Sequence, residues 1–581
     1  MIGSFRLFAT AAALLTATTT LTAQSYPKGG DPRDGLKSGV ADAGQAAKGM
    51  RLLATAPKPA PFDSVRGLTF VNSDLAFRGN MVYQGNFAGF SIWDVSNPSA
   101  PVMMSVVPCI TSQGDPSIIG NLLFVSAEGG GNRNDCAKGG VQTPADHMAG
   151  VRIYDVSNPR APRLVKNVQT CKGSHTHTVI PHPKDKGIVY IYVSGSGGVR
   201  KEMAGCVEGT DPADETNSLY RLDVIKVPLA NPEAAEVVTG ARIFTGIGGA
   251  ARRGGREAAA SGPRNCHDVS AYPAFGLLAG ACGSHGLLVD VSNPEKPVRL
   301  DAAADTNFSL WHTAVFSNDG TKLLFTDEWG GGTGPMCQAT SMLEMGGNTV
   351  LSIGKDRKLT KHAYFKIPTG QTAQENCVSH NGSLIPVPGR DIMVQGWYQG
   401  GVSVLDFTDP NKPFELAFFD RGPIDAPPAA GDTTRRRGGT IGGSWGAYYY
   451  NGYVYSSEMA RGLDILEMMP TDQLSANELA AAKLVMLDEF NPQSQPKIVW
   501  PAAFPVIRSY LDQLVRGNGL SAARTTAIAK ALDAAEAKSG AARATALRTL
   551  AGQVEKDVAG ASDKERVKAM AGEMRRLAAL K

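Results

Sequence analysis

Four of the nine histidines in this sequence share one kind of position, at the start of a short run of apolar and β-branched residues. Such a run is typical of a buried β-strand. Neutral imidazole nitrogens are good ligands for Fe, Cu and Zn, and four of them match the ligand number that such ions take. If these strands converge, the histidines are predicted to form one transition-metal site. They are His177, His267, His312 and His380.

Four acidic residues are predicted to orient these histidines. A carboxylate that accepts a hydrogen bond from the second ring nitrogen of a ligating histidine fixes the orientation and the tautomer of that ring. Three glutamates fall where second strands are expected to end, and one aspartate directly follows a candidate ligand. The four are Glu128, Glu328, Glu458 and Asp268. The alternative interpretation is that the histidines and acids are structural residues that line a channel.

The elements that must position these side chains are sequence repeats. An apolar run followed by D-V-S-N-P, or by the variant D-F-T-D-P, occurs four times, and three degenerate copies bring the number to seven. Asp and Asn side chains stabilise turns, while Pro ends the strand before it. A second hairpin precedes each repeat, which gives four-stranded units. Seven such units predict a seven-bladed β-propeller over residues 65–470, in which the first strands line one central channel.

The repeated hairpin V-x-I-x-D-V-S-N-P-x-x-P resembles the LVIVD repeat of exported and surface proteins of bacteria and archaea. The match is clear at the copies that begin near residues 91, 151, 286 and 402, and weaker at the other three. The resemblance implies a β-propeller outside the cytoplasm. It implies no particular reaction.

The eight cysteines are predicted to form disulfides, since their number is even and the chain carries an export signal. Eight cysteines allow 105 pairings. Four lie shortly before a blade and four follow a second strand, so pairing in sequence order keeps each bridge local. We therefore expect Cys109–Cys136, Cys171–Cys206, Cys266–Cys282 and Cys337–Cys377.

The first 24 residues are predicted to be a cleaved signal peptide. Arg6 precedes a short apolar run, and small residues lead to Ala23. The run is too short to span a membrane, and no later segment is long and apolar enough to do so. We expect an exported protein that is periplasmic, extracellular or held at the cell surface.

Segments outside the propeller have their own composition. Residues 25–64 are rich in Gly, Ala, Lys and Pro, and are predicted to be a flexible arm. A capping box at Ser475 and Glu478 opens a helical linker over residues 471–501. Alanine-rich amphipathic segments over residues 502–581 predict a small helical bundle.

Composition limits the classes of function. The net charge is only +4, so no nucleic-acid partner is expected. The glycine-rich loops follow strands and open no helix, which argues against a nucleotide cofactor. Our main hypothesis is a binding protein with a histidine-lined metal or ligand site at the channel mouth, where the metal would be Fe, Cu or Zn. A protein or glycan partner would then contact the propeller face or the terminal helices. The alternative is an Fe- or Cu-dependent oxidase or oxygenase that uses the four histidines.

Overall fold

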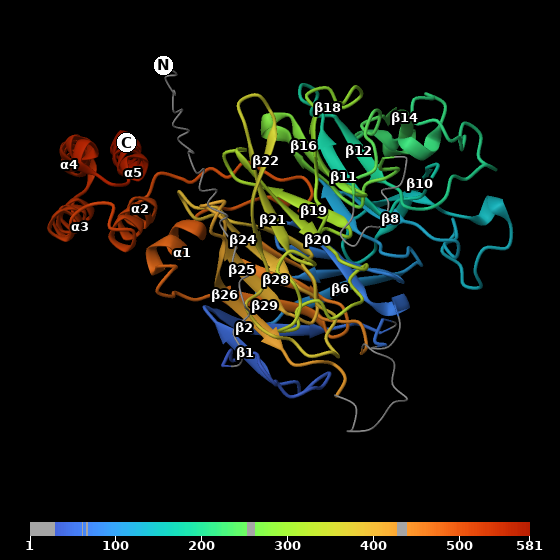
Figure 1. The fold of residues 1–581 in the computed structure, drawn as a ribbon, viewed down its shortest axis with the longest axis horizontal. Coiled ribbons are helices and arrows are strands. Elements are labelled where there is room, and N and C mark those ends of the chain that lie inside the picture. The colour runs from blue at the N-terminus through green and yellow to red at the C-terminus, as the bar shows by residue number, and fades with distance from the viewer. Residues whose placement is uncertain (1–29, 61, 65–67, 252–261, 427–438, 581) are drawn as a thin grey trace, which may run out of the picture.

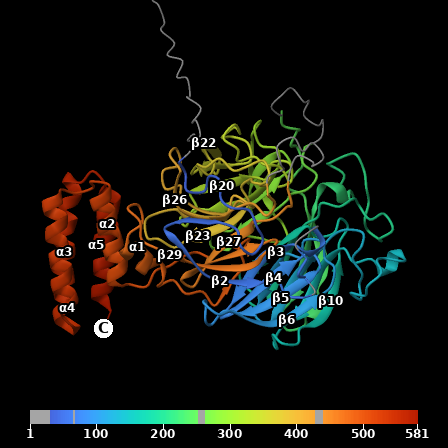
Figure 2. The same ribbon diagram turned by 90° about the horizontal axis from the view of Figure 1, so that it is seen from below.

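A computed structural model describes residues 30–60, 62–64, 68–251, 262–426 and 439–580. The predicted signal peptide lies outside these residues. Strands dominate the described chain up to residue 468, and helices dominate its end. Figures 1 and 2 show the two parts side by side, with the helical bundle at one flank of the strands.

The strands pair into seven antiparallel units of four. The first three units, from the inner to the outer strand, are β3 (Asn72–Arg78), β4 (Met81–Asn86), β5 (Gly89–Asp94) and β6 (Val102–Pro108); β7 (Pro116–Ile119), β8 (Leu122–Ala127), β9 (Gly150–Asp155) and β10 (Arg163–Gln169); and β11 (Thr176–Pro181), β12 (Ile188–Ser194), β13 (Leu222–Pro228) and β14 (Glu236–Ala241). The next two are β15 (Val269–Tyr272), β16 (Leu277–Cys282), β17 (His285–Asp290) and β18 (Val298–Ala304); and β19 (Trp311–Phe316), β20 (Lys322–Asp327), β21 (Asn348–Ile353) and β22 (Leu359–Phe365). The last two are β23 (Asn381–Ile385), β24 (Ile392–Gly396), β25 (Val402–Asp406) and β26 (Phe414–Arg421); and β27 (Ser444–Tyr450), β28 (Tyr453–Glu458), β29 (Gly462–Met468) and β2 (Met50–Pro57).

The seven innermost strands form a closed ring. Each contacts the next in the order β3, β7, β11, β15, β19, β23 and β27, and β27 contacts β3 again. The sixth and seventh units are also joined directly, because β23 pairs with β27 in parallel. This closed succession of four-stranded units confirms the predicted β-propeller.

The N-terminal segment closes the ring, which differs from the flexible arm expected over residues 25–64. Strand β2 is the outer strand of the seventh unit, where Met50 pairs with Met468. Strand β1 (Gln45–Lys48) adds a fifth strand to the sixth unit. The last unit is therefore assembled from both ends of the propeller sequence.

The D-V-S-N-P motif forms the turn between the third and fourth strands of a unit. In the first copy the Asp94 carboxylate accepts a hydrogen bond from the backbone N–H of Ser96 at 2.8 Å. The side-chain carbonyl of Asn97 accepts another from Ser99 at 3.1 Å. The second copy repeats the first of these bonds at Asp155 with 2.9 Å. The motif is thus a local turn signal, which is why it repeats so faithfully.

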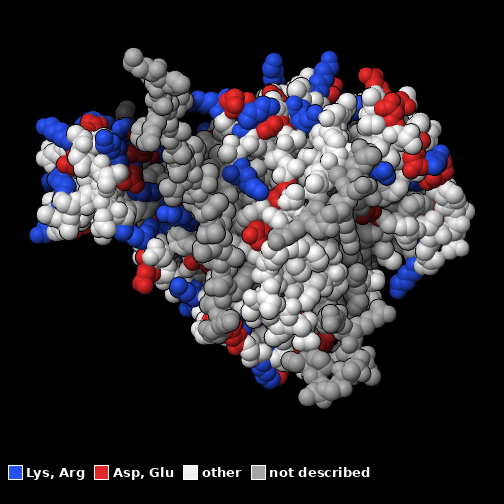
Figure 3. Space-filling model, viewed as in Figure 1, with Lys and Arg blue, Asp and Glu red and all other residues white. Residues whose placement is uncertain are grey.

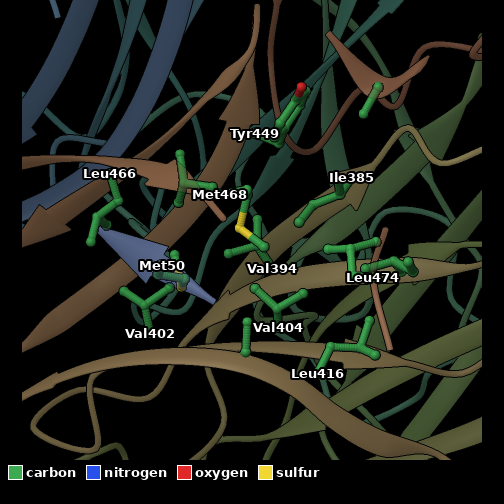
Figure 4. Packing of buried hydrophobic residues seen from close by; sticks show 14 of the residues in the cluster. Met50, Ile385, Val394, Val402, Val404, Leu416, Tyr449, Leu466, Met468 and Leu474 are labelled. Carbon is green, nitrogen blue, oxygen red and sulfur yellow. The ribbon is translucent and has the colours of Figure 1, made fainter. Parts of the chain in front are cut away.

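The core between units consists of apolar side chains from facing sheets. Between the sixth and seventh units, Val394 and Val404 pack beside Leu466 and Met468 (Figure 4). Met50 from β2 belongs to the same cluster. Burial of an aliphatic side chain contributes about 1.5–3 kcal/mol, so this strand from the N-terminal segment contributes to the stability of the ring.

A segment after the propeller crosses the central channel, and we call residues 489–500 the channel strap. It starts as β30 (Glu489–Phe490), which pairs with the inner strand β3. Further along, Gln493 and Gln495 bond the backbone of Ala271 in β15 at 2.7 and 2.8 Å. The Trp500 indole N–H donates to the carbonyl of Pro386, near the sixth unit, at 2.7 Å. These contacts lie toward the ends of the inner strands, so the strap closes that end of the channel.

The C-terminal part is helical, as expected. Its helices are α1 (Ala476–Ala482), α2 (Phe504–Arg516), α3 (Ala522–Glu536), α4 (Gly540–Asp557) and α5 (Lys564–Ala579). The capping box at Ser475 and Glu478 is present, but the helix it opens ends at Ala482. The rest of the predicted helical linker consists of turns, isolated β-bridges, the short strand β30 and irregular chain. The Glu478 carboxylate also pairs with Arg390 and Arg516, which docks the bundle on the sixth unit.

The described surface shows no segregation of charge on the face in view. Basic and acidic side chains are intermixed along the upper edge and on the bundle (Figure 3). No described helix has the length and apolar character needed to cross a membrane.

Candidate metal centre at the channel mouth

Four histidines form a continuous arc at the channel end opposite the strap. His175 and His380 each directly precede an inner strand, His312 lies near the start of β19, and His267 lies two residues before β15. The ring centroids are 4.3 Å apart for His175 and His267, 4.0 Å for His267 and His312, and 4.1 Å for His312 and His380. Four neighbouring units, the third to the sixth, thus each supply one imidazole.

Three of these rings point one nitrogen at a single carboxylate. The Nε2 atoms of His267, His312 and His380 lie 3.6, 3.7 and 3.7 Å from the carboxylate oxygens of Glu328. The Nε2 of His175 lies 2.8 Å from that of His267. Two ligand atoms about 2.1 Å from a shared ion, at angles of about 90–120°, are roughly 3.0–3.6 Å apart. The three distances to Glu328 lie near the upper end of this range. Among the described residues, the ligand atoms of His312, Glu328 and His380 all lie within 4.8 Å of one another, and so do those of His267, Asp268 and His312.

The other ring nitrogen of these histidines faces an acceptor. Nδ1 of His175 donates to Glu128 at 2.8 Å, and Nδ1 of His267 donates to Asp268 at 3.0 Å. Nδ1 of His380 donates to the backbone carbonyl of Trp445. These acceptors place a proton on Nδ1. Nε2 of His380 then keeps a free lone pair, whereas the facing Nε2 atoms of His175 and His267, 2.8 Å apart, share one proton. Carboxylate and carbonyl partners of this kind orient metal-binding histidines.

Burial keeps two of the rings neutral. It lowers the pKa of His380 to about 4 and, together with the nearby histidines, lowers the pKa of His312 well below its ordinary value. Burial also acts on His267, but the hydrogen bond and negative charge of Asp268, followed by Glu328 and Glu128, raise the pKa of His267. At neutral pH the lone pairs of His312 and His380 are therefore available to a ligand.

No donor among the described residues bonds the Nε2 lone pairs of His312 and His380. Both of these nitrogen atoms are buried. They face the Glu328 carboxylate, which is also electron-rich, so the arrangement is unfavourable by itself. A cation between the rings and the carboxylate would satisfy all of these atoms at once. A nitrogen-rich set with one carboxylate suits Fe, Cu or Zn better than Ca²⁺ or Mg²⁺, which prefer oxygen ligands.

Two predicted site residues lie elsewhere. His177 sits within β11, and its Nδ1 contacts the hydroxyl of Ser126 at 2.8 Å, while its Nε2 has no partner among the described residues. The Glu458 carboxylate accepts hydrogen bonds from the backbone and side chain of Arg461 and from the N–H of Gly443. No described contact joins either residue to the arc of histidines, whereas Glu128, Glu328 and Asp268 do contact it.

A glycine lets the loop after β20 cover this centre. A Cβ on Gly332 would lie 2.4 Å from the Tyr398 hydroxyl and 2.7 Å from the Glu328 carboxylate, and the φ of Gly332 is +68°. The Tyr398 hydroxyl donates to Glu328, and its ring centroid lies 4.6 Å from that of His380. Loop and phenol together leave Glu328 only 8% exposed.

Comparison with known families decides the type of repeat. The family model for the LVIVD repeat matches residues 72–108 and 145–170, which cover the first unit and the second hairpin of the second unit. These two segments match the LVIVD repeat, and the chain folds as a β-propeller. No curated protein matches it.

Three solved structures that are similar to this chain share little sequence with it. The Dos1 propeller shows 12% identity and a TM-score of 0.37, and covers 68% of this chain and 77% of its own. Sqt1 of Saccharomyces cerevisiae shows 11% identity and a TM-score of 0.37, and the match covers 70% of this chain and 98% of Sqt1. Hydrazine synthase of Kuenenia stuttgartiensis shows 12% identity and a TM-score of 0.38, and the match covers 66% of this chain and 91% of the hydrazine synthase chain.

The arc of histidines contains His175 in place of the predicted His177, which lies two residues further along the chain. His175 lies at the mouth, whereas His177 is one step inside β11 and faces Ser126 of the neighbouring unit. The sequence shows two histidines close together, His175 and His177. The start of β11 at Thr176 determines which of them lies at the channel mouth. The contact of the Tyr398 phenol with Glu328 has no signature in the sequence.

The propeller contains four disulfides, two of which lie beside segments that carry the centre. Their pairings are those expected from the position of each cysteine relative to its blade, and no described cysteine is free. Cys266 directly precedes His267 and is bonded to Cys282 in the next strand. Cys377 lies three residues before His380. These bridges restrict the segments that present two of the histidines.

Proposed function

We propose that this protein is an exported binding protein that holds a first-row transition-metal ion at the mouth of its channel. The proposed ligands are the Nε2 atoms of His175, His267, His312 and His380 and the carboxylate of Glu328. The supporting observation is that buried imidazole lone pairs converge on one carboxylate with no donor between them. The location outside the cytoplasm is supported by the four disulfides.

The chain would contribute three things to such a centre. Glu128 and Asp268 hold the rings by Nδ1, so that little reorganisation is needed when an ion enters. The buried surroundings of His312 and His380 keep these ligands deprotonated at neutral pH. The propeller face and the terminal helices remain available for a protein or glycan partner, a role that propellers often take.

Metal analysis of untagged mature protein, exported to the bacterial periplasm, tests this proposal. Wild-type protein should contain about one Fe, Cu or Zn ion per chain, and the double variant His267→Ala/His380→Ala should contain none. The double variant His177→Ala/His285→Ala removes the same number of histidines outside the arc and should retain the ion. Metal-free wild-type protein after growth in metal-rich medium, or a full metal content in the first variant, would overturn the proposal.

A second candidate function is an oxidase or oxygenase that uses bound Fe or Cu. Aromatic rings support it, because Tyr398 and Trp445 each pack against His380 with centroids 4.6 Å apart. They form an apolar cluster with Val71, Val378 and Met459 beside the ligands. Oxygen uptake by the reduced, metal-loaded protein distinguishes the two functions: catalytic uptake supports the enzyme, and its absence supports a binding role.

A further inference from the structure

The channel strap reaches the candidate metal centre through one buried carboxylate. Asp268 is fully buried. One of its oxygens accepts the hydrogen bond from Nδ1 of His267 at 3.0 Å. The other lies 3.5 Å from the side-chain nitrogen of Gln493, which belongs to the strap. The two ends of the channel are therefore linked in the order Gln493, Asp268, His267.

The position of Gln493 is determined by the backbone rather than by its side chain. The N–H of Ala271 donates to the carbonyl of Gln493 at 2.7 Å, and the N–H of Gln495 donates to the carbonyl of Ala271 at 2.8 Å. Ala271 lies only three residues after Asp268. The strap is thus held in one register against the strand that carries Asp268, and the amide of Gln493 is aimed at that carboxylate.

The amide nitrogen of Gln493 also donates to a second buried carboxylate, that of Asp74, at 3.1 Å. Both neighbours are acceptors, so this nitrogen acts as a shared donor between two carboxylates. Asp74 has three further donors, from Leu75, Asn381 and Tyr448. Among the described residues, the carboxylate of Asp268 has only His267 and Gln493 as donors, so loss of Gln493 would leave one of its oxygens without a described donor.

On the basis of the proposed metal site, we propose that Gln493 is a positioning residue for it. The strap amide sets the orientation of the Asp268 carboxylate, and Asp268 in turn aims Nε2 of His267 at the ion. Residues that orient a metal-binding histidine from outside the ligand set typically change metal affinity by about 10–100-fold when they are replaced. Gln493 acts one step further out, so an effect at the lower end, about 10-fold, is expected.

The variant Gln493→Met keeps the length of the side chain and removes its donor. It should bind Zn²⁺ about 10-fold more weakly than wild type, measured by competition with a chelator. Gln495→Met is the matched control, since Gln495 lies two residues away in the strap and bonds only the backbone of Phe316 through its side chain, at 3.0 Å. It should bind Zn²⁺ like wild type. If Gln493→Met does not fold, Gln493→Asn, which is too short to reach Asp268, replaces it.

A double-mutant cycle with Asp268→Asn separates positioning from a structural effect. If Gln493 acts through Asp268, its replacement has no further effect on Zn²⁺ affinity in the Asp268→Asn background. The Cu²⁺-loaded protein gives a second readout, because its electron paramagnetic resonance spectrum should change in Gln493→Met and not in Gln495→Met. This inference alone would be overturned if Gln493→Met bound Zn²⁺ with the same affinity as wild type. It would also be overturned if the effects of the Gln493 and Asp268 replacements on Zn²⁺ affinity were additive. Absence of binding to wild type would instead overturn the proposed function.

Discussion

Replacing His312 with leucine should make the metal-free protein more stable. The Nε2 of His312 is buried without a partner and lies 3.7 Å from the Glu328 carboxylate. An unpaired buried polar atom costs about 1–3 kcal/mol, and an apolar side chain of similar volume removes that cost. The Nδ1 contact with Thr326 is long, at 3.5 Å, so little is lost there. We expect the free energy of unfolding to rise by about 1–2 kcal/mol.

With Zn²⁺ bound, wild-type protein should be more stable than His312→Leu, the reverse of the order expected without metal. An ion that binds only the folded state at 100 times its dissociation constant adds about 2.7 kcal/mol to the free energy of unfolding. Wild-type protein should gain this amount, and His312→Leu should gain nothing. Urea unfolding followed by tryptophan fluorescence, with and without Zn²⁺, measures both quantities.

His177→Leu is the control for this experiment. His177 also has a buried Nε2 without a partner, but it lies outside the arc of histidines. Its replacement should leave the stabilisation by Zn²⁺ unchanged. The reasoning is refuted if metal-free His312→Leu is less stable than wild type, or if Zn²⁺ stabilises it as much as wild type.

Three further predictions concern acid stability, protons and disulfides. Burial alone would raise the pKa of Glu128, but its hydrogen bonds hold it at about 2, against an ordinary value of 4.5. About 3 kcal/mol of stability that is present above pH 4.5 should therefore be lost as the pH falls toward 2, and Glu128→Gln should not show this loss in urea titrations. One proton must lie between the facing Nε2 atoms of His175 and His267, so Zn²⁺ binding should release about one proton. Below the raised pKa of His267, the affinity for Zn²⁺ should therefore fall about tenfold per pH unit. Calorimetry in buffers of different ionisation enthalpy checks this, and a heat that is independent of the buffer would contradict it. Removal of one disulfide in Cys266→Ser/Cys282→Ser should weaken Zn²⁺ binding, because this bridge holds the segment that carries His267. Removal of the Cys109–Cys136 disulfide should leave Zn²⁺ affinity unchanged. Equal Zn²⁺ affinities of the two variants would count against a role of the Cys266–Cys282 bridge.

The propeller could be predicted because its signal is local. Each D-V-S-N-P copy builds its own turn through bonds between residues two apart, such as Asp94 and Ser96. The cysteine pairs could be predicted for the same reason, since each bridge closes a short loop. Strand β2 could not, because its partner β29 lies far along the chain and nothing near β2 completes a hairpin.

The candidate site could be predicted only in outline. The recurrence of histidines at strand starts was enough to indicate His267, His312 and His380. The choice between His175 and His177 depends on where β11 begins, and the pattern of residue types does not fix that boundary. Gln493 lies in a segment rich in Asn, Gln and Pro that resembles a linker in composition, and its contact with Asp268 has no signature in the sequence.

The closure of the ring by β2 has a consequence for how the chain folds. Met50 and Met468 pair across more than about 400 residues, so the seventh unit cannot be completed until nearly the whole propeller has been synthesised. Contacts at such separations form slowly, and strand edges left unpaired in the meantime promote aggregation. We therefore expect ring closure to be a late folding step, with misassembly starting at the open edges of β2 and β29. The strap, which follows the seventh unit in the chain, can settle only around the same time.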